Sequence, residues 1–207
     1  MSGPSAELEK ESGDLRRGEL LNAAASLFAS RGYHAVSMRE LAKQLRIKAG
    51  SLYYHIASKE QLLNEICAIG VRELILNVDQ AISGHDSFAS RMRAIVSGHA
   101  RLIDRFGDYL RCYQSEHVHL SPDIREHMRL ELARFYRKIE EVLKDAATKG
   151  EVRAEINVKV ARSAVIGILF QLSRVQSDQR NYEVIANGFS DILINGLAKH
   201  GSSDGPA

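Results

Sequence analysis

The residues of this 207-residue chain whose types and spacing could do chemistry lie in one stretch, residues 37–55. Serine, tyrosine, histidine and basic side chains alternate there with apolar ones, and such polar groups contact the phosphates and base edges of DNA. A helix with small or flat polar residues on its outer face fits a major groove about 12 Å wide. The stretch therefore fits a helix-turn-helix, in which Leu45, Ile47 and Leu52 are spaced to hold two helices at a steep angle.

The charge of the chain is concentrated around the same stretch. Residues 15–60 carry eight basic and three acidic side chains, which gives this segment a net charge of +5. The residues after 60 carry 19 basic and 19 acidic side chains, and the whole chain has a net charge of only +2. A compact basic segment joined to a neutral body predicts that the segment meets an anionic partner.

The elements that position this stretch are expected to be helices. Apolar residues recur at helical spacing along almost the whole chain, and no segment has a convincing strand pattern. Ser37 with Glu40, and Ser58 with Gln61, have the spacing of capping boxes that begin helices. The expected fold class is all-α with about nine helices, and the first three of them form the helix-turn-helix domain.

An ordered string of residues resembles the DNA-binding domain of the tetracycline-repressor (TetR) family of transcriptional regulators. The matching residues are Gly32-Tyr33, Ser37, Leu41-Ala42, Ile47, Gly50-Ser51-Leu52-Tyr53-Tyr54-His55-Ile56, Ser58-Lys59-Glu60 and Leu62. The likeness spans residues 16–64, about a quarter of the chain. It implies phosphate contacts by Ser37, Arg39, Tyr53, His55 and Lys59. It implies base contacts by Lys48, Gly50, Ser51 and Tyr54.

Two residues depart from the family pattern. Arg46 stands at the turn position that usually holds glycine, where a left-handed backbone would cost a non-glycine residue about 1 kcal/mol. Lys48 stands where a serine or threonine usually caps the second helix, and it cannot cap but can reach a guanine or a phosphate. The alternative, an ordinary packed or solvated side chain, stays open for Tyr53, His55, Arg39 and Lys43.

The resemblance also implies how the chain is organised. A C-terminal helical domain would bind an effector and form a homodimer, so that two recognition helices meet successive major grooves of a near-palindromic, double-stranded operator. The expected segments are a flexible tail at 1–13, a helix-turn-helix DNA-binding domain at 14–61, an effector-binding and dimerisation domain at 62–199, and a flexible tail at 200–207.

Two sets of C-terminal residues are candidates for these roles, although packing within one chain is an alternative for both. The last two helices, expected at 158–178 and 182–199, are apolar on more than one face and could form a four-helix bundle with a second copy. The candidate dimer residues are Val165, Leu169, Leu172, Phe189, Ile192, Leu193 and Leu197. The candidate effector-pocket residues, on the middle and penultimate helices, are His99, Ile103, Phe106, Tyr109, Tyr113, His117, Phe135, Tyr136 and Phe170.

A fainter likeness concerns the effector. Glu116, Leu120-Ser121-Pro122, Arg134-x-Tyr136 and the segment 149–153 are similar to the effector domains of regulators of lipid and acyl-CoA catabolism. This likeness implies a long cavity for an acyl chain, and another hydrophobic or aromatic effector is the alternative. The expected function is that of a ligand-responsive repressor, released from its operator by a small hydrophobic effector such as a fatty acyl-CoA.

Other functions find little support in the sequence. It has no Gly-rich phosphate loop, GxSxG, HExxH or paired carboxylates in helical register, so we expect neither enzyme activity nor a cofactor. His117, His119 and His127 do not have the spacing of metal ligands, and Cys67 and Cys112 form no CxxC pair. A helical enzyme acting on a hydrophobic substrate and a dimeric helical adaptor are the alternatives, and a salt titration of DNA binding separates them from a regulator.

The sequence also bears on location. No apolar run reaches the roughly 18–20 residues of a membrane-spanning helix. The first residues lack the basic and apolar segments of a secretion signal. We therefore expect no membrane partner, and a cytoplasmic protein with reduced cysteines.

Overall fold

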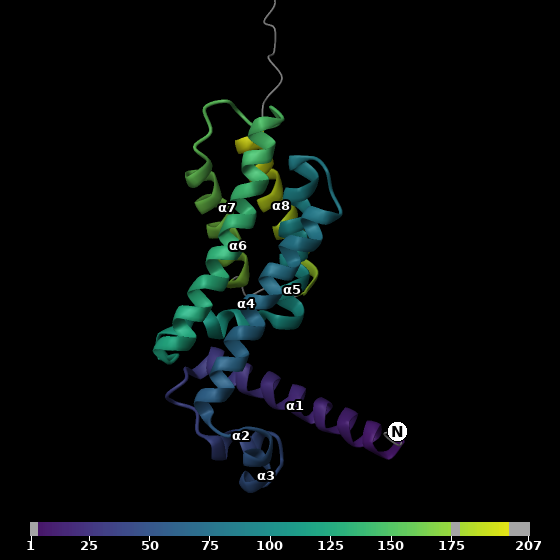
Figure 1. The fold of residues 1–207 in the computed structure, drawn as a ribbon, viewed down its shortest axis with the longest axis vertical. Coiled ribbons are helices and arrows are strands. Elements are labelled where there is room, and N and C mark those ends of the chain that lie inside the picture. Colours follow the sequence, from purple (N-terminus) through teal and green to yellow (C-terminus); the bar gives the residue numbers. More distant parts are fainter. Residues whose placement is uncertain (1–3, 175–178, 199–207) are drawn as a thin grey trace, which may run out of the picture. The chain divides into compact units, whose positions relative to one another are not determined.

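The computed structural model describes residues 4–174 and 179–198, with side chains at 17–54, 56–174 and 182–198. This part of the chain forms eight α-helices and one short 3-10 helix, and the expected all-α fold class is confirmed (Figure 1). It contains no strand, only an isolated β-bridge between Val152 and Ala198. None of the described helices is long and apolar enough to cross a membrane. The helices are α1 (Pro4–Arg31), α2 (Met38–Gln44), α3 (Ala49–His55), α4 (Lys59–Ser83), α5 (Phe88–Glu116), η1 (His117–His119), α6 (Pro122–Thr148), α7 (Val158–Arg174) and α8 (Gln179–Leu197).

One helix boundary differs from the sequence expectation. Helix α1 begins at Pro4, inside the segment 1–13 that was expected to be a tail because it has no periodic apolar face. Helix α5 continues through Gly107, and it has non-helical angles at Phe106 (φ −125°, ψ 17°). Gly107 is not among the described glycines with a positive φ, so this site is a kink within a helix rather than a left-handed helix end. The expected tail at 200–207 lies outside the described residues.

The chain divides into two compact units. The first unit combines the chain up to residue 71 with residues 108–128, and the second combines residues 72–107 with the chain from residue 129. Helices α4, α5 and α6 therefore each contribute residues to both units.

Within the first unit, side-chain hydrogen bonds tie α1 to two other helices. Arg17 donates to both carboxylate oxygens of Glu65 on α4, at 2.7 and 2.8 Å. The Tyr109 hydroxyl, near the end of α5, donates to Asn22 Oδ1 at 2.6 Å. Burial, together with the charge of Asp108, raises the pKa of Tyr109 to about 12, so the hydroxyl keeps its proton and remains a donor.

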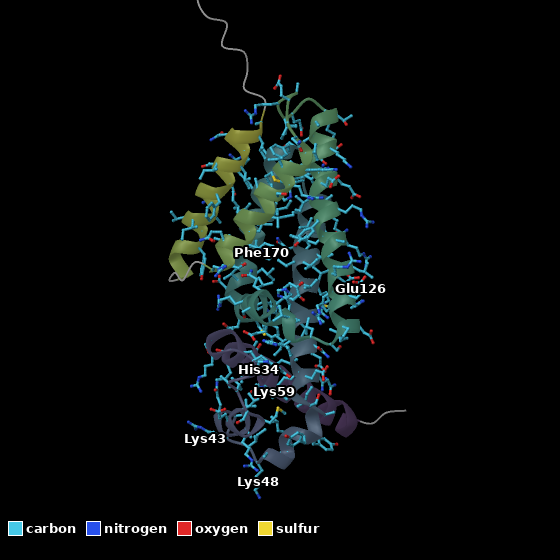
Figure 2. All side chains as sticks on the ribbon, turned by 90° about the vertical axis from the view of Figure 1, so that its left-hand side faces the viewer. His34, Lys43, Lys48, Lys59, Glu126 and Phe170 are labelled. Carbon is cyan, nitrogen blue, oxygen red and sulfur yellow. The ribbon has the colours of Figure 1, made fainter. Side chains whose placement is uncertain are left out.

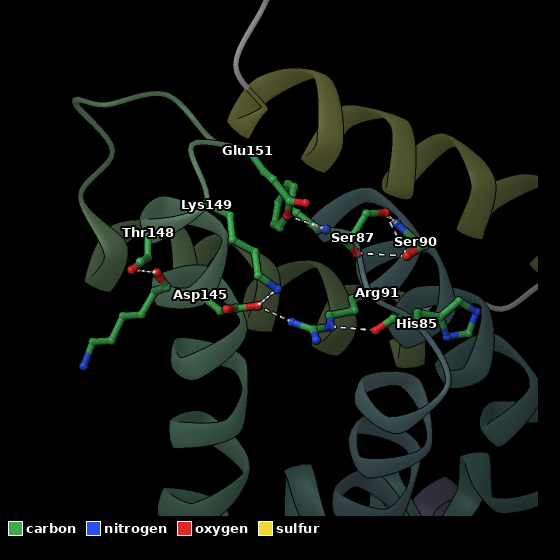
Figure 3. Close-up of polar contacts among 10 residues, drawn as sticks. His85, Ser87, Ser90, Arg91, Asp145, Thr148, Lys149 and Glu151 are labelled. Carbon is green, nitrogen blue, oxygen red and sulfur yellow. Dashed lines mark hydrogen bonds and ion pairs between the residues drawn. The ribbon is translucent and has the colours of Figure 1, made fainter.

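Within the second unit, an ionic network joins the start of α5, the end of α6 and the loop that follows it (Figure 3). Asp145 Oδ2 accepts hydrogen bonds from Arg91 at 2.6 Å and from Lys149 at 2.8 Å. The hydrogen bond from Lys149, and then that from Arg91, lowers the pKa of Asp145. Glu151 Oε2 accepts from the backbone N–H of Phe88 at 2.8 Å, which places a carboxylate on a free amide at the first turn of α5.

Helices α4 and α5 approach closely at Gly98. A Cβ added there would lie 1.9 Å from Oδ1 of Asn77, whose Nδ2 donates to the Ile95 carbonyl at 3.0 Å. We expect Gly98→Ala to displace the Asn77 side chain and lower the free energy of unfolding by about 1–2 kcal/mol, although alanine is the better helix former. Urea unfolding of Gly98→Ala in the wild-type and Asn77→Ala backgrounds measures this. An equal loss in both backgrounds would contradict the clash, because Asn77→Ala removes the obstructing atom.

Candidate nucleic-acid interface

Helix α2 begins with the capping box that the sequence predicts. Ser37 has an extended backbone (φ −100°, ψ 155°), its Oγ accepts from the Glu40 N–H at 3.2 Å, and Glu40 Oε2 accepts from the Ser37 N–H at 2.8 Å. The backbone hydrogen bond from Ser37, and then that from its hydroxyl, lowers the pKa of Glu40 and keeps the carboxylate ionised. The cap leaves Arg39 exposed in the first turn of α2, where the free N–H groups and a basic side chain both favour an anion.

The turn between α2 and α3 is a Schellman motif built on Arg46. The Arg46 N–H donates to Lys43 O at 3.1 Å and the Ile47 N–H donates to Ala42 O at 3.0 Å. Arg46 has a φ of +56°, in the left-handed region that favours glycine. The turn therefore keeps the conformation that a glycine would adopt, and the strain expected for an arginine at this position is present.

Replacement of Arg46 by glycine is expected to relieve this strain. We expect Arg46→Gly to raise the free energy of unfolding by up to about 1 kcal/mol, since the strain relieved exceeds the extra backbone entropy that glycine loses. This corresponds to a melting temperature roughly 2–4 °C higher in a thermal melt of a domain of this size. Arg46→Ala removes the same charge but keeps a Cβ, so it is the control and should give no gain. Equal melting temperatures for the two variants would show that the backbone at Arg46 is not strained.

Helix α3 has one buried and one open face. Leu52 is fully buried, whereas Ser51 is exposed and Tyr53 and Tyr54 are 53% and 88% exposed. Beyond its own turn of helix, an added Cβ at Gly50 would meet nothing within 4 Å among the described residues, so the fold itself does not require a glycine there. The open face of α3 therefore consists of small and flat polar side chains, as the sequence predicts.

The flanks of α3 place basic side chains toward solvent. Lys48 is the N-cap residue, and as expected its side chain makes no capping hydrogen bond. Lys43 and Lys48 both extend outward from their unit (Figure 2). Of the three apolar residues expected to hold the two helices, Leu45 is half-buried and Ile47 is 39% exposed, so Leu52 is the main anchor. The His55 side chain lies outside the described residues.

Helix α4 begins with the cap that the sequence predicts. Ser58 Oγ accepts from the Gln61 N–H at 3.0 Å, while Gln61 Oε1 accepts from the Ala57 N–H rather than from the Ser58 N–H.

The first turn of α4 also carries a lysine in a partly buried environment. The Lys59 ammonium lies 4.2 Å from the centroid of the Tyr33 ring. Burial lowers the pKa of Lys59, against the opposing effect of the Glu40 charge. Lys59 is thus a half-buried cation on an aromatic ring, next to the free amides of a helix N-terminus.

The loop before α2 is held by contacts that the sequence did not predict. Glu116 Oε2, at the end of α5, accepts from the Tyr33 N–H at 3.0 Å. His34 Nε2 lies 3.1 Å from His119 Nδ1 on η1, and the His119 ring stacks on Tyr33 with centroids 5.7 Å apart. Residues 108–128 therefore pack directly on the helix-turn-helix within the first unit. More than 80 residues separate these partners in the chain, so no local spacing could have revealed the contacts.

The structure divides the candidate effector-pocket residues between the two units. Tyr109, Tyr113 and His117 belong to the first unit. His99, Ile103, Phe106, Phe135, Tyr136 and Phe170 belong to the second. Four of the nine are buried, namely His99, Ile103, Tyr109 and Phe135, and the others are half-buried. Among the described residues, no group of three or more His, Cys, Asp or Glu side chains could hold a metal ion.

The candidate dimer residues on α7 and α8 also fall into two groups. Four of them are buried within a single chain: Val165, Leu169, Leu172 and Leu193. These four side chains pack within their own unit. Phe189 and Leu197 are half-buried, and Ile192 is 65% exposed, so these three can face a second copy.

A capped helix, a tight turn and a second short helix with an open polar face, in an otherwise helical chain, define a helix-turn-helix DNA-binding protein. Comparisons with known families agree. Residues 20–66 match the family described as "Bacterial regulatory proteins, tetR family", and residues 85–197 match "Tetracyclin repressor-like, C-terminal domain". The chain belongs to the TetR family. It is a DNA-binding transcriptional regulator, and the family is one of regulators rather than enzymes.

Individual relatives support this assignment. The chain is 34% identical over 160 residues to the HTH-type transcriptional repressor KstR2 of Rhodococcus jostii (strain RHA1), covering 76% of this chain and 77% of that protein. It shares its fold with the structure of the ketosteroid transcriptional regulator KstR2 of Mycobacterium tuberculosis, with a TM-score of 0.83, 23% identity, and coverage of 89% and 96%. It is also similar to AibR in complex with isovaleryl coenzyme A and operator DNA, with a TM-score of 0.76, 25% identity, and coverage of 86% and 98%.

Proposed function

We propose that this chain is a repressor that binds a near-palindromic operator as a homodimer and leaves it when an acyl-CoA or a related hydrophobic thioester binds. The observation that carries the proposal is the open polar face of α3, opposite the fully buried Leu52. Lys48 at the N-cap of α3 and Lys43 on α2 both point outward (Figure 2). The similarity to a protein named as a repressor supports repression. The similarity to a regulator bound to isovaleryl coenzyme A and operator DNA supports the thioester. Such a regulator acts on DNA in the cytoplasm.

Two groups of side chains have different tasks in this proposal. Those at helix starts and on the flanks fix the position of the protein on the phosphates: Ser37, Arg39, Tyr53, His55 and Lys59. Those on the open face of α3 read the bases: Lys48, Gly50, Ser51 and Tyr54. The exposure of Arg39, Lys48 and Ser51 supports this division, since each can reach DNA without unfolding its helix.

The exposed face of α7 and α8 supports the homodimer. Val160, Val184 and Ile192 are each about two-thirds exposed, at 65%, 68% and 65%. An added Cβ at the exposed glycines Gly167 and Gly188 would meet nothing within 4 Å. Small residues beside exposed apolar ones allow two helix pairs to approach closely across a two-fold axis. The dimer would place two copies of α3 on the two halves of the operator.

Release of DNA follows from a shift between conformations. An effector that binds one conformer more tightly than the other lowers operator affinity by that difference in binding free energy. Helix α4 belongs to the first unit up to Val71 and to the second from Arg72, so it is a continuous covalent link through which such a shift is transmitted.

Fluorescence anisotropy on duplexes selected from a random library by the protein tests the DNA contacts. Between 50 and 200 mM salt, we expect affinity to fall steeply, because each neutralised phosphate adds about 0.9 to the logarithmic slope. Arg39→Ala removes two contacts per dimer, so it should reduce that slope by about 2 and weaken all sequences alike. Lys48→Ala should instead relax sequence preference. Arg101→Ala, at an exposed arginine of the second unit, is the control and should change neither quantity.

An unchanged slope for Arg39→Ala would contradict the phosphate role. The direction of regulation is measured by transcription in vitro from a promoter that contains the selected duplex. Transcription should fall on addition of the protein and recover with isovaleryl-CoA or longer acyl-CoAs, but not with free CoA. A rise in transcription on addition of the protein would show that it is an activator. Equal recovery with free CoA would show that the acyl chain is not recognised.

A further inference from the structure

The second unit contains a buried histidine whose side chain is only partly hydrogen-bonded. His99 on α5 is 2% exposed, and its Nε2 lies 2.8 Å from Ser173 Oγ on α7. The helix positions around this pair are buried and apolar, with Val96 and Ile103 on α5 and Leu169 on α7. Burial of two polar side chains in such surroundings costs free energy unless each of their polar atoms has a hydrogen-bond partner.

The hydrogen bonds of Ser173 favour one tautomer of His99. Ser173 Oγ donates to the Leu169 carbonyl at 3.2 Å. With its hydrogen in that bond, the same oxygen accepts from His99 Nε2–H, and Nδ1 carries a bare lone pair. Burial lowers the pKa of His99 to about 4, against the opposing effect of the Leu169 carbonyl, so the ring is neutral at physiological pH.

Nothing in the described part of the chain satisfies this lone pair. His99 Nδ1 is buried and has no hydrogen-bond partner there. The buried serines of the same unit differ, since Ser173 and Ser190 both have partners, Ser190 Oγ donating to Ala186 O at 2.8 Å. Buried polar atoms without a partner are rare in proteins, and an apolar side chain would pack at this position without the penalty. The unpaired Nδ1 is therefore a candidate contact for a bound molecule.

We propose that His99 Nδ1 accepts a hydrogen bond from a hydroxyl group on the apolar part of the effector. The proposal rests on the proposed function, in which a hydrophobic effector binds in the C-terminal domain, and it narrows the effector class. In that tautomer, a carboxylate, ketone or ether oxygen would face the Nδ1 lone pair as a second acceptor. An amide could donate its N–H, but it would also bring a carbonyl into apolar surroundings. A neutral alcohol supplies the donor and buries no carbonyl, so its additional desolvation cost is the smallest.

Binding of matched probes tests this assignment. Octanoyl-CoA is compared with 3-hydroxyoctanoyl-CoA, and 1-octanol with heptyl methyl ether, which has the same length but no O–H. We expect the wild-type protein to bind each hydroxylated probe about three- to tenfold more tightly in calorimetry, the effect of one net hydrogen bond. His99→Phe should remove the preference. His127→Phe, at an exposed histidine, is the matched control and should keep it.

A second measurement does not depend on any variant. In protein labelled with ¹⁵N-histidine, 1-octanol should move the His99 Nδ1 resonance upfield, the direction for a nitrogen lone pair that gains a hydrogen bond, whereas the ether should not. An unmoved resonance, together with equal affinities within each pair, would overturn the role of His99. A hydroxyl preference that persists in folded His99→Phe would overturn it as well.

These experiments distinguish a failure of the thioester proposal from a failure of the hydroxyl contact at His99. If neither thioester binds or releases the operator but 1-octanol moves the Nδ1 resonance, the thioester is wrong and the hydroxyl contact stands. If both thioesters release the operator equally and Nδ1 does not respond, the proposed function stands and the hydroxyl contact is wrong.

Discussion

Gly50→Ala is expected to weaken operator binding about ten- to a hundredfold while leaving the protein at least as stable as wild type. An added Cβ meets nothing within 4 Å among the described residues outside its own turn of helix, and alanine in a helix is up to about 1 kcal/mol more favourable than glycine. At a close-packed contact with base edges, however, an extra methyl group costs roughly 1–3 kcal/mol. The loss of binding would therefore come from the DNA surface itself and not from misfolding.

Thermal melts and anisotropy on the selected duplex separate these two effects for Gly50→Ala. Gly18→Ala is the matched control, because Gly18 also lies in a helix with nothing within 4 Å of an added Cβ. Gly18→Ala should preserve affinity. Full affinity in Gly50→Ala would show that the open face of α3 does not approach the bases closely.

Leu52→Ala, two residues further along the same helix, is expected to lower DNA affinity because it destabilises the packing of α3, not because it changes the DNA-facing surface. Leu52 is fully buried, and truncation of a buried leucine costs about 2–5 kcal/mol. Helices α2 and α3 have seven residues each, too short to persist without tertiary anchoring. The melting temperature should fall by roughly 4–20 °C, and apparent affinity should fall with the fraction of protein whose α3 is in place.

The temperature dependence identifies the cause of this loss. Binding by Leu52→Ala should recover toward the wild-type value on cooling from 37 to 10 °C, whereas binding by Gly50→Ala should stay weak at both temperatures. Leu45→Ala, at a half-buried residue of the same core, is the matched control and should show a smaller effect. A Leu52→Ala protein that melts like wild type would mean that Leu52 does not anchor α3.

Features set by nearby residues could be predicted from the sequence. The cap at Ser37 depends on a residue three positions away, and the absent cap at Lys48 follows from its side chain alone. Both caps depend on local interactions, so the residue types and their spacing are sufficient. The left-handed turn at Arg46 was instead expected from the resemblance to the family, in which glycine usually holds this position.

Features set by distant residues could not be predicted. The position of the Lys59 ammonium on Tyr33, and the packing of His119 on the loop before α2, depend on segments that meet only in the folded unit. The same limit applies to α7, because an apolar stripe does not show whether it packs on a second copy or on another helix of the same chain. Leu169 is buried inside its own unit, whereas Ile192 on α8 is exposed.

Dimethyl sulfate footprinting on a selected operator is the most direct test of whether α3 lies in the major groove, because the reagent reports guanine N7 there. We expect two symmetric protected patches whose centres lie one helical turn, about 10–10.5 base pairs, or a multiple of it, apart. At the lowest concentration that saturates the wild type, both patches should be clearly weaker with Gly50→Ala. A duplex that is bound but unprotected in the major groove, or protected in a single patch, would contradict major-groove binding by a dimer.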